Sequence, residues 1–277
     1  MRFDRLITLN LVRPLRSAFG LRSSVFRLPI LMYHSVSDQD EPLAPYYVTN
    51  TRPAVFRNQM RFLAGKKIRV VDLETALNGQ LGTDCVVITF DDGFRDFYTT
   101  AFPVLREFGF TATMFVPTGL IDQERGSFKG RACMTWEEVR TLAEAGIRFG
   151  SHTVSHPKLH GLEWAKIETE LTESKNRLEK MLDGQVTAFA YPFAYPQADD
   201  SFTDQFEGLL QRTGYRCNVT TRIGRAQQED DPFSLRRLPM NSFDDDQLFH
   251  AKLSGGYDWL AGPQAVAKQV KRWVSRG

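Results

Sequence analysis

The sequence lacks any uninterrupted apolar run near the ~20 residues that a membrane-spanning helix requires. A secretory signal is not predicted either, because Asn10 and Arg13 interrupt the only apolar stretch at the N-terminus that resembles the core of one. We therefore expect a cytoplasmic protein that is not exported by a standard signal.

Neither sign of charge is in excess. Lys and Arg number 35, Asp and Glu number 33, and the formal net charge is +2. A balance this even gives no reason to expect a nucleic-acid partner. Cysteine is scarce as well, since Cys85, Cys133 and Cys217 are the three in 277 residues and stand far apart. We expect reduced, structural thiols rather than a disulfide framework or a metal cluster.

What is present is enough apolar side chain for one large core. With 277 residues, 42% of them hydrophobic, the chain is long enough for a single α/β domain. We see no repeat, low-complexity tract or linker that divides it. We predict a catalytic domain over residues 28–277, preceded by an N-terminal arm or helix over residues 1–27.

The arm has apolar residues at roughly helical spacing from Phe3 to Phe19, with arginines among them. This pattern has two interpretations. The arm is either a terminal helix docked on the body of the protein, where amphipathicity is usual, or a helix that makes peripheral contact with an acidic membrane surface.

Predicted strands and helices alternate along the rest of the chain. This alternation indicates a parallel sheet with helices outside it. Unusual polar residues directly follow several strands, which favours a closed (β/α) barrel, where the residues after the strands meet at one mouth. We expect strands within residues 29–34, 68–71, 85–90, 111–116, 147–150, 186–190 and 215–219, and helices within 53–63, 98–108, 136–145, 162–182 and 202–213.

Asp91 and Asp92 follow residues 85–90, whose apolar and β-branched character predicts a buried strand. Burying an ionised carboxylate is costly unless it is paired or bound to a metal. Successive side chains of an extended segment point in opposite directions. One of the two acids can therefore bind a metal while the other faces a substrate.

His152 and His156 stand four residues apart directly after another predicted strand. On a helical turn this spacing places two imidazoles on one side, where both can reach one cation. Together with a carboxylate at a neighbouring strand end, they predict a hydrolytic zinc site with an open position for water.

These two motifs, residues 89–93 (Thr-Phe-Asp-Asp-Gly) and residues 152–157 (His-Thr-Val-Ser-His-Pro), resemble those of the polysaccharide deacetylase family, carbohydrate esterase family four. The spacing fits the family from about Leu28 to Met240. The resemblance implies an irregular (β/α) barrel of about seven parallel strands.

The resemblance also implies roles for the motif residues. It makes Asp91 the catalytic base. It makes Asp92, His152 and His156 the ligands of Zn²⁺ or another divalent transition metal.

A third family motif reads arginine, any residue, proline, aromatic, and here it is Ala190, Tyr191, Pro192 and Phe193. The match at the aromatic implies that the Phe193 amide donates to the oxyanion of the reaction. Because alanine replaces the arginine, we expect an arginine from elsewhere, Arg237 or its neighbour Arg236, to orient the base.

The family usually has its general-acid histidine near the C-terminus, after apolar residues. Residues 31–34 (Leu-Met-Tyr-His) have this form near the N-terminus, as in a circularly permuted branch that includes exopolysaccharide and poly-N-acetylglucosamine deacetylases. By this resemblance His34 is the general acid. Tyr191 and Trp136 are candidates for stacking on a sugar ring of the substrate.

The resemblance implies a metal-dependent hydrolase that removes N-acetyl groups from the amino sugars of a polysaccharide or glycolipid. Two alternatives stay open. One is an O-deacetylase or a cyclic-amide hydrolase with the same metal site. The other is a non-catalytic glycan-binding member, suggested by the missing motif arginine.

Overall fold

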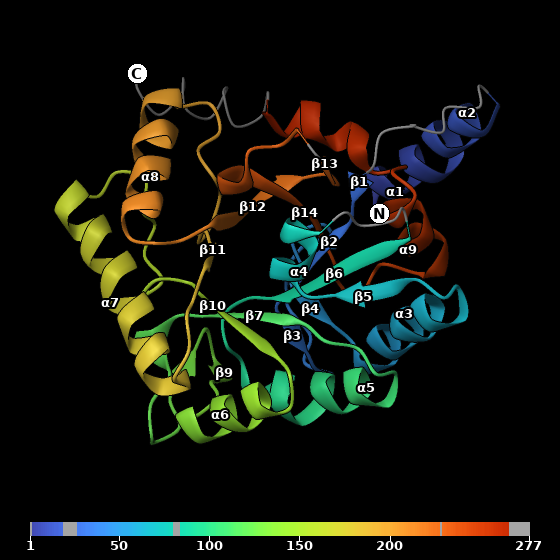
Figure 1. Ribbon diagram of the computed structural model, residues 1–277. Coiled ribbons are helices and arrows are strands. Elements are labelled where there is room, and N and C mark those ends of the chain that lie inside the picture. The colour runs from blue at the N-terminus through green and yellow to red at the C-terminus, as the bar shows by residue number, and fades with distance from the viewer. Residues whose placement is uncertain (1, 19–26, 80–83, 228, 266–277) are drawn as a thin grey trace.

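A closed ring of seven parallel strands forms the centre of the computed structural model, with helices around its outside (Figure 1). The structure describes residues 2–18, 27–79, 84–227 and 229–265. The predicted (β/α) barrel in a single domain is therefore confirmed. In ring order the strands are β2 (Ile30–Tyr33), β14 (Leu235–Pro239), β12 (Cys217–Ile223), β11 (Ala188–Ala190), β10 (Arg148–Ser151), β7 (Thr113–Val116) and β6 (Cys85–Phe90).

The ring closes where β2 pairs with β6, with Ile30 opposite Val87 and Tyr33 opposite Phe90. An eighth strand, β5 (Arg69–Val71), makes the barrel irregular. It pairs with the first half of β6, whereas β7 pairs with the last two residues of β6 on the same side. Each strand pair of the ring and the β5–β6 pair are parallel, so all the carboxyl ends lie at one mouth.

Helices cover the outside of the ring, and local sequence signals fix where several of them begin. Thr135 and Glu138 form a capping box at the start of α6, with Glu138 N donating to Thr135 Oγ1 and Thr135 N to Glu138 Oε2. The helices are α3 (Pro53–Gly65), α4 (Leu73–Asn78), α5 (Phe102–Glu107), α6 (Trp136–Glu144), α7 (Trp164–Leu182), α8 (Asp200–Arg212) and α9 (Asp246–Leu253).

Short strands and an N-terminal helix complete the fold. The helix begins as α1 (Phe3–Ile7), widens to a π-helical segment (Thr8–Val12) and ends as α2 (Arg13–Ala18). None of the described helices combines the length and the apolar character that crossing a bilayer takes. The short strands are β1 (Arg27–Leu28), β3 (Ser35–Val36), β4 (Asn50–Thr51), β8 (Ser127–Phe128), β9 (Arg131–Ala132) and β13 (Ala226–Gln227).

The core has two layers because successive strand residues face opposite sides. In β6, Val86 and Ile88 pack in the larger cluster with the helices, whereas Cys85 and Val87 pack in a smaller cluster formed mainly by strand residues, inside the barrel. The three cysteines are buried thiols that form no disulfide. The same alternation in β14 places Leu235 in the inner cluster, and Arg237, two residues later, shares its side of the strand.

Candidate active site

The predicted site residues come from separate strand ends that the barrel brings to one mouth. His34 follows β2, and the acidic pair follows β6. The first histidine of the pair directly follows β10, the Tyr-Pro-Phe segment follows β11, and the arginine lies in β14. The residues gathered in this way are His34, Asp91, Asp92, His152, His156, Phe193 and Arg237.

Asp92 and the two histidines form a buried group that can hold a metal ion. Their nearest ligand atoms all lie within 4.8 Å of one another. Asp92 Oδ1 is 3.3 Å from His156 Nε2 and 3.7 Å from His152 Nε2. Among the described residues this buried oxygen accepts no hydrogen bond, which is costly unless a cation binds it. One carboxylate oxygen and two imidazole nitrogens suit a divalent transition metal.

The His152 ring is oriented by a backbone contact. Its Nδ1 lies 2.7 Å from the carbonyl oxygen of Ala190, so Nδ1 carries the proton and donates it. Nε2 is then left as the ligand atom that faces Asp92. Burial, reinforced by the nearby His156, lowers the pKa of His152 to about 4, which keeps the ring neutral at pH 7.

The segment that carries the two histidines is a loop and not the helical turn predicted from their spacing. Glu170, buried on α7, fixes its shape. Glu170 Oε2 accepts hydrogen bonds from the amides of Val154 and Ser155, each at 2.9 Å, and Oε1 accepts from the Ser155 hydroxyl at 2.7 Å. Sequence reasoning missed Glu170, although an acid among the buried positions Ile167, Leu171 and Ser174 of α7 is a signal for it.

Backbone strain is concentrated around this group. Seven non-glycine residues in the described chain have positive φ, and five of them lie in the loops of the site. Each such conformation costs about 1–3 kcal/mol and persists only where surrounding contacts impose it. The five are Asp92 (φ 72°), Lys129 (φ 51°), Thr153 (φ 71°), His156 (φ 55°) and Phe193 (φ 58°).

Asp91 is held by Arg237. Arg237 Nη1 and Nη2 donate to the two oxygens of Asp91, each at 2.7 Å, and Arg237 Nε donates to the Thr220 carbonyl at 3.0 Å. Burial alone would raise the pKa of Asp91, but the charge and hydrogen bonds of Arg237, together with the nearby His152 and His34, outweigh it and hold that pKa below its usual value. Arg236 points to the other side of β14, 3.7 Å from Asp230. The alternation of β14 therefore places Arg237, and not Arg236, beside the carboxylate.

His34 lies at the edge of the same group. Its Nε2 is 3.9 Å from Asp91 Oδ2, and its side chain is 19% exposed. Burial lowers the pKa of His34 even though Asp91 opposes that shift. The imidazole thus lies directly beside the Asp91 carboxylate and is reachable from solvent.

The three predicted aromatic residues are placed differently from one another. Phe193 is 49% exposed, and its ring centroid lies 4.6 Å from that of His156. Within the described chain its amide N–H donates to no group. Trp136 and Tyr191 are buried, Trp136 as the first residue of α6 and Tyr191 against Tyr195. A sugar ring cannot stack on Trp136 or Tyr191 while they are packed this way, so of these three residues Phe193 is the one that a ligand can reach.

Sequence reasoning also missed Lys129, in the turn between β8 and β9. Its Nζ is 3.0 Å from Asp92 Oδ2, and it lies 4.6 Å from the centre of the Phe128 ring. Arg131, on β9, donates to the hydroxyls of Ser35 and Ser37 at 2.9 and 2.8 Å and so ties this hairpin to the mouth. The sequence around Lys129 predicts a turn at Gly130, but it carries no signal that relates the turn to Asp92.

Comparison with known proteins identifies similar chains. The family model described as polysaccharide deacetylase matches residues 78–217. YxkH of Bacillus subtilis (strain 168), named as a polysaccharide deacetylase, is 29% identical over 217 residues, or 76% of this chain and 71% of that protein. A poly-β-1,6-N-acetyl-D-glucosamine N-deacetylase of Escherichia coli (strain K12) is 27% identical over 145 residues, or 44% of this chain and 20% of that protein.

Solved structures share the fold. The structure described as the Streptococcus pyogenes deacetylase PplD in complex with acetate has a TM-score of 0.72 and 26% identity, and the match covers 83% of this chain and 99% of that chain. IcaB from Ammonifex degensii has a TM-score of 0.68 and 22% identity, with 83% of this chain and 97% of that chain covered.

Proposed function

The chain belongs to the polysaccharide deacetylase family, and we propose that it hydrolyses the N-acetyl groups of amino sugars in a polysaccharide or glycolipid with the help of a divalent metal. One observation carries the proposal. Asp91, clamped by Arg237, adjoins the ligand group of Asp92, His152 and His156 at the barrel mouth. A base and a metal site in this relation are what amide hydrolysis requires.

Asp92 Oδ1 and the Nε2 atoms of His152 and His156 would hold the metal. Two imidazoles and one carboxylate are the protein ligands of several hydrolytic zinc sites, so Zn²⁺ or a similar transition metal fits. When bound there, a divalent cation supplies a Lewis acid for the carbonyl of the acetyl group.

Asp91 would act as the general base. Arg237 holds its pKa below the usual value, so the carboxylate is ionised at neutral pH and can take a proton from the attacking water. The two hydrogen bonds from Arg237 also fix the plane of the carboxylate. Arg237 touches Asp91 and not the reacting atoms, and we assign it a positioning role.

The remaining steps would use Phe193 and His34. Water oxygen bonds to the acetyl carbon, and the negative charge that develops on the carbonyl oxygen accepts a hydrogen bond from the Phe193 N–H. The proton that Asp91 takes from the water would pass to His34, whose Nε2 is 3.9 Å from Asp91 Oδ2, and His34 would give it to the sugar nitrogen as the carbon–nitrogen bond breaks. The second proton of the water would leave the new carboxyl group for the amine. The products would then be acetate and the ammonium form of the amino sugar, so atoms and charges balance.

The choice of an amino-sugar substrate is supported by relatives. Proteins named poly-β-1,6-N-acetyl-D-glucosamine N-deacetylase from Escherichia coli and Staphylococcus aureus match 44% and 52% of this chain. The same site chemistry also suits an O-acetyl ester or a cyclic amide. The Arg237–Asp91 pair weakens the second alternative, a non-catalytic glycan-binding member, because that alternative was suggested by the missing motif arginine.

The test is acetate release by metal-loaded protein from matched oligosaccharides. We expect release from N-acetylglucosamine oligomers, and little from the same oligomers carrying O-acetyl groups on otherwise free amines. Release from the O-acetylated set alone would replace the proposal with an O-deacetylase. Binding of the N-acetylated set without any acetate release would indicate the glycan-binding member.

A further inference from the structure

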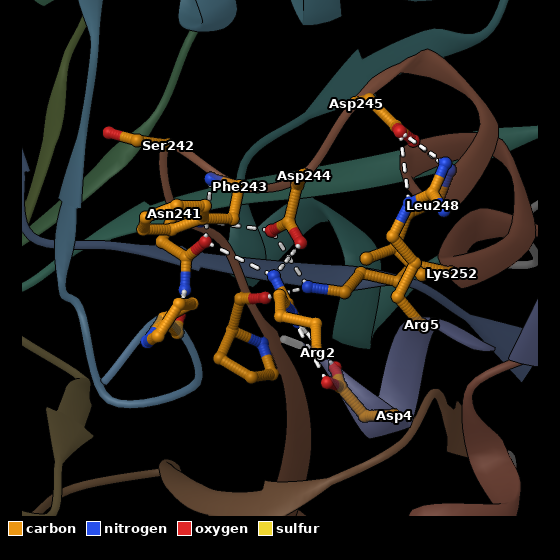
Figure 2. Close-up of polar contacts among 12 residues, drawn as sticks. Arg2, Asp4, Arg5, Asn241, Ser242, Phe243, Asp244, Asp245, Leu248 and Lys252 are labelled. Atoms are coloured by element: carbon orange, nitrogen blue, oxygen red, sulfur yellow. Dashed lines mark hydrogen bonds and ion pairs between the residues drawn. The ribbon is translucent and has the colours of Figure 1, made fainter. Parts of the chain in front are cut away.

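The N-terminal helix is attached to the barrel by buried polar side chains (Figure 2). Arg2 Nη1 donates to Asp244 Oδ1 at 2.8 Å, and Arg2 Nη2 donates to Asp4 Oδ2 at 2.5 Å. Tyr257 donates its hydroxyl to the same oxygen of Asp4, and Lys252 Nζ is 2.7 Å from Asp244 Oδ2. The charged side chains of this network are at most 7% exposed.

The polar contact continues one turn along the helix. Thr8 is fully buried, and its Oγ1 accepts a hydrogen bond from Trp259 Nε1 at 3.0 Å. Asp4 and Thr8 are four residues apart and so share one face. Arg5, at the edge of that face, pairs with Asp245. The side of the helix that faces the protein is therefore the polar one.

The outward side is apolar. Phe3 is 70% exposed, Ile7 37%, Leu11 55% and Leu15 45%. On an α-helix of about 3.6 residues per turn, positions four apart drift around the axis. The wider turn of the π-helical segment, Thr8–Val12, offsets part of that drift and keeps these four side chains in one stripe. A surface helix normally buries its apolar stripe against the protein, whereas this helix exposes its apolar stripe and buries polar side chains.

The charge of the helix is also distributed unequally. Among residues 3–18, Asp4 is the only acid, while Arg5, Arg13 and Arg16 are basic. Asp4 is buried and already paired with Arg2. Arg13 is exposed and lies close enough to His250 on α9 for its charge to act on that ring. Because Arg13 is two residues from both Leu11 and Leu15, it lies on a different side of the helix from the stripe. The helix thus combines an exposed apolar stripe with an excess of positive charge outside the stripe, a combination that complements the acyl boundary and headgroups of an anionic bilayer.

We propose that the stripe of Phe3, Ile7, Leu11 and Leu15 docks the protein on an anionic lipid surface, and that the excess positive charge of the helix favours anionic headgroups. The polar network on the opposite side, built on Arg2 and Asp4, holds the helix in place before it meets the lipid. Docking therefore does not require the helix to fold on the membrane, which removes an entropic cost of binding.

Vesicle sedimentation of the full chain tests the proposal without any substrate. Wild type is compared on phosphatidylcholine vesicles and on vesicles with about 30% phosphatidylglycerol. Ile7→Asp and Leu11→Asp test the stripe, and Leu77→Asp on α4 is the matched control, because Leu77 is 38% exposed and Ile7 37%. Circular dichroism establishes that each variant is folded.

We expect wild type to bind the anionic vesicles, with the partition coefficient reduced about tenfold or more by Ile7→Asp or Leu11→Asp and unchanged by Leu77→Asp. Arg13→Glu should weaken binding to anionic vesicles selectively. Absence of wild-type binding, or an equal loss in the Leu77→Asp control, overturns the proposal. If wild type does not bind vesicles and the stripe variants differ from it in oligomeric mass, the stripe contacts a second copy of the chain and the lipid proposal is wrong. Vesicle binding and oligomeric mass are both measured without deacetylase activity, so these outcomes are independent of the proposed function.

Discussion

Arg237 donates to both carboxylate oxygens of Asp91, and the two residues come from strands separated by β2 in the ring. Alanine occupies the family position from which an arginine would be expected. The contact with the base is instead made from β14, nearly fifty residues further along the chain from Ala190. Whether an arginine reaches the base thus depends less on its position in the sequence than on which side of its barrel strand it lies.

Replacing Arg237 by lysine should reduce kcat about 100-fold, because a single ammonium cannot hold both carboxylate oxygens. The pKa of Asp91 should rise, since burial is then opposed by a weaker contact. A base with a higher pKa is deprotonated only at higher pH, so the acidic limb of the kcat/KM profile should move to higher pH. Arg236→Lys, on the other side of β14, is the control and should leave the profile unchanged. An unmoved acidic limb in Arg237→Lys would contradict the positioning role.

Glu170→Gln should weaken metal binding about tenfold or more, because the loop between the two histidine ligands loses its anionic hydrogen-bond acceptor. Competition with a chromophoric chelator measures the metal Kd directly. Glu173→Gln is the matched control, since Glu173 is exposed on the same helix. Equal affinities in the two variants would mean that the loop keeps its shape without Glu170.

Lys129→Met should strengthen metal binding, by about three- to tenfold at low salt. The Lys129 ammonium lies 3.0 Å from Asp92 Oδ2 and competes with a divalent cation for the charge of that carboxylate. Lys129 is 47% exposed, so the difference from wild type should shrink as salt is added. The measurement is metal Kd against salt concentration in both proteins. Weaker metal binding in the variant would show that Lys129 supports Asp92 as a ligand.

Asp4→Asn should destabilise the protein at neutral pH by about 1–3 kcal/mol, because the buried Arg2 loses a charged partner. Burial alone would raise the pKa of Asp4, but hydrogen bonds from Arg2 and Tyr257 hold it below its usual value. A carboxyl with a lowered folded-state pKa contributes stability above its unfolded pKa of about 4 and loses that contribution as the pH falls through the folded pKa.

Thermal unfolding of wild type and Asp4→Asn between pH 7 and pH 3 measures this effect. The difference in Tm should be constant near neutrality and decrease below about pH 4. Asp40→Asn, which breaks an exposed ion pair with Arg52, should have a much smaller effect at every pH. A Tm difference between wild type and Asp4→Asn that does not change with pH would show that packing, and not the charge of Asp4, stabilises this contact.

The strands and the ligand group were predictable from the sequence because their signals are local. A continuous apolar run marks β6, and the acids that follow it stand out by the cost of burying them. The contacts of Arg237 and Glu170 were harder to predict. They depend on which side of β14 faces the inside of the barrel and on which side of α7 faces the loop of the two histidines. The alternation of side chains along β14 and the helical period of α7 show which residues share a side. They show what that side contacts only when the position of the neighbouring strand or loop is known.

The conformation of residues 152–156 and the direction of the N-terminal helix were less accessible. The spacing of His152 and His156 suits a helical turn, yet hydrogen bonds from the loop amides to Glu170 on α7 impose a loop. Amphipathicity revealed the N-terminal helix without revealing which side it buries. That side is decided by Asp244 and Tyr257, which are more than 230 residues away along the chain.

The division of labour between the adjacent acids is the central claim, and one paired measurement tests it most directly. Metal content and acetate release are determined for Asp91→Asn and His152→Ala. We predict that Asp91→Asn binds the metal as wild type does while its turnover falls about 1000-fold, and that His152→Ala loses both. Near wild-type turnover in Asp91→Asn, or undiminished metal affinity in His152→Ala, would contradict the account.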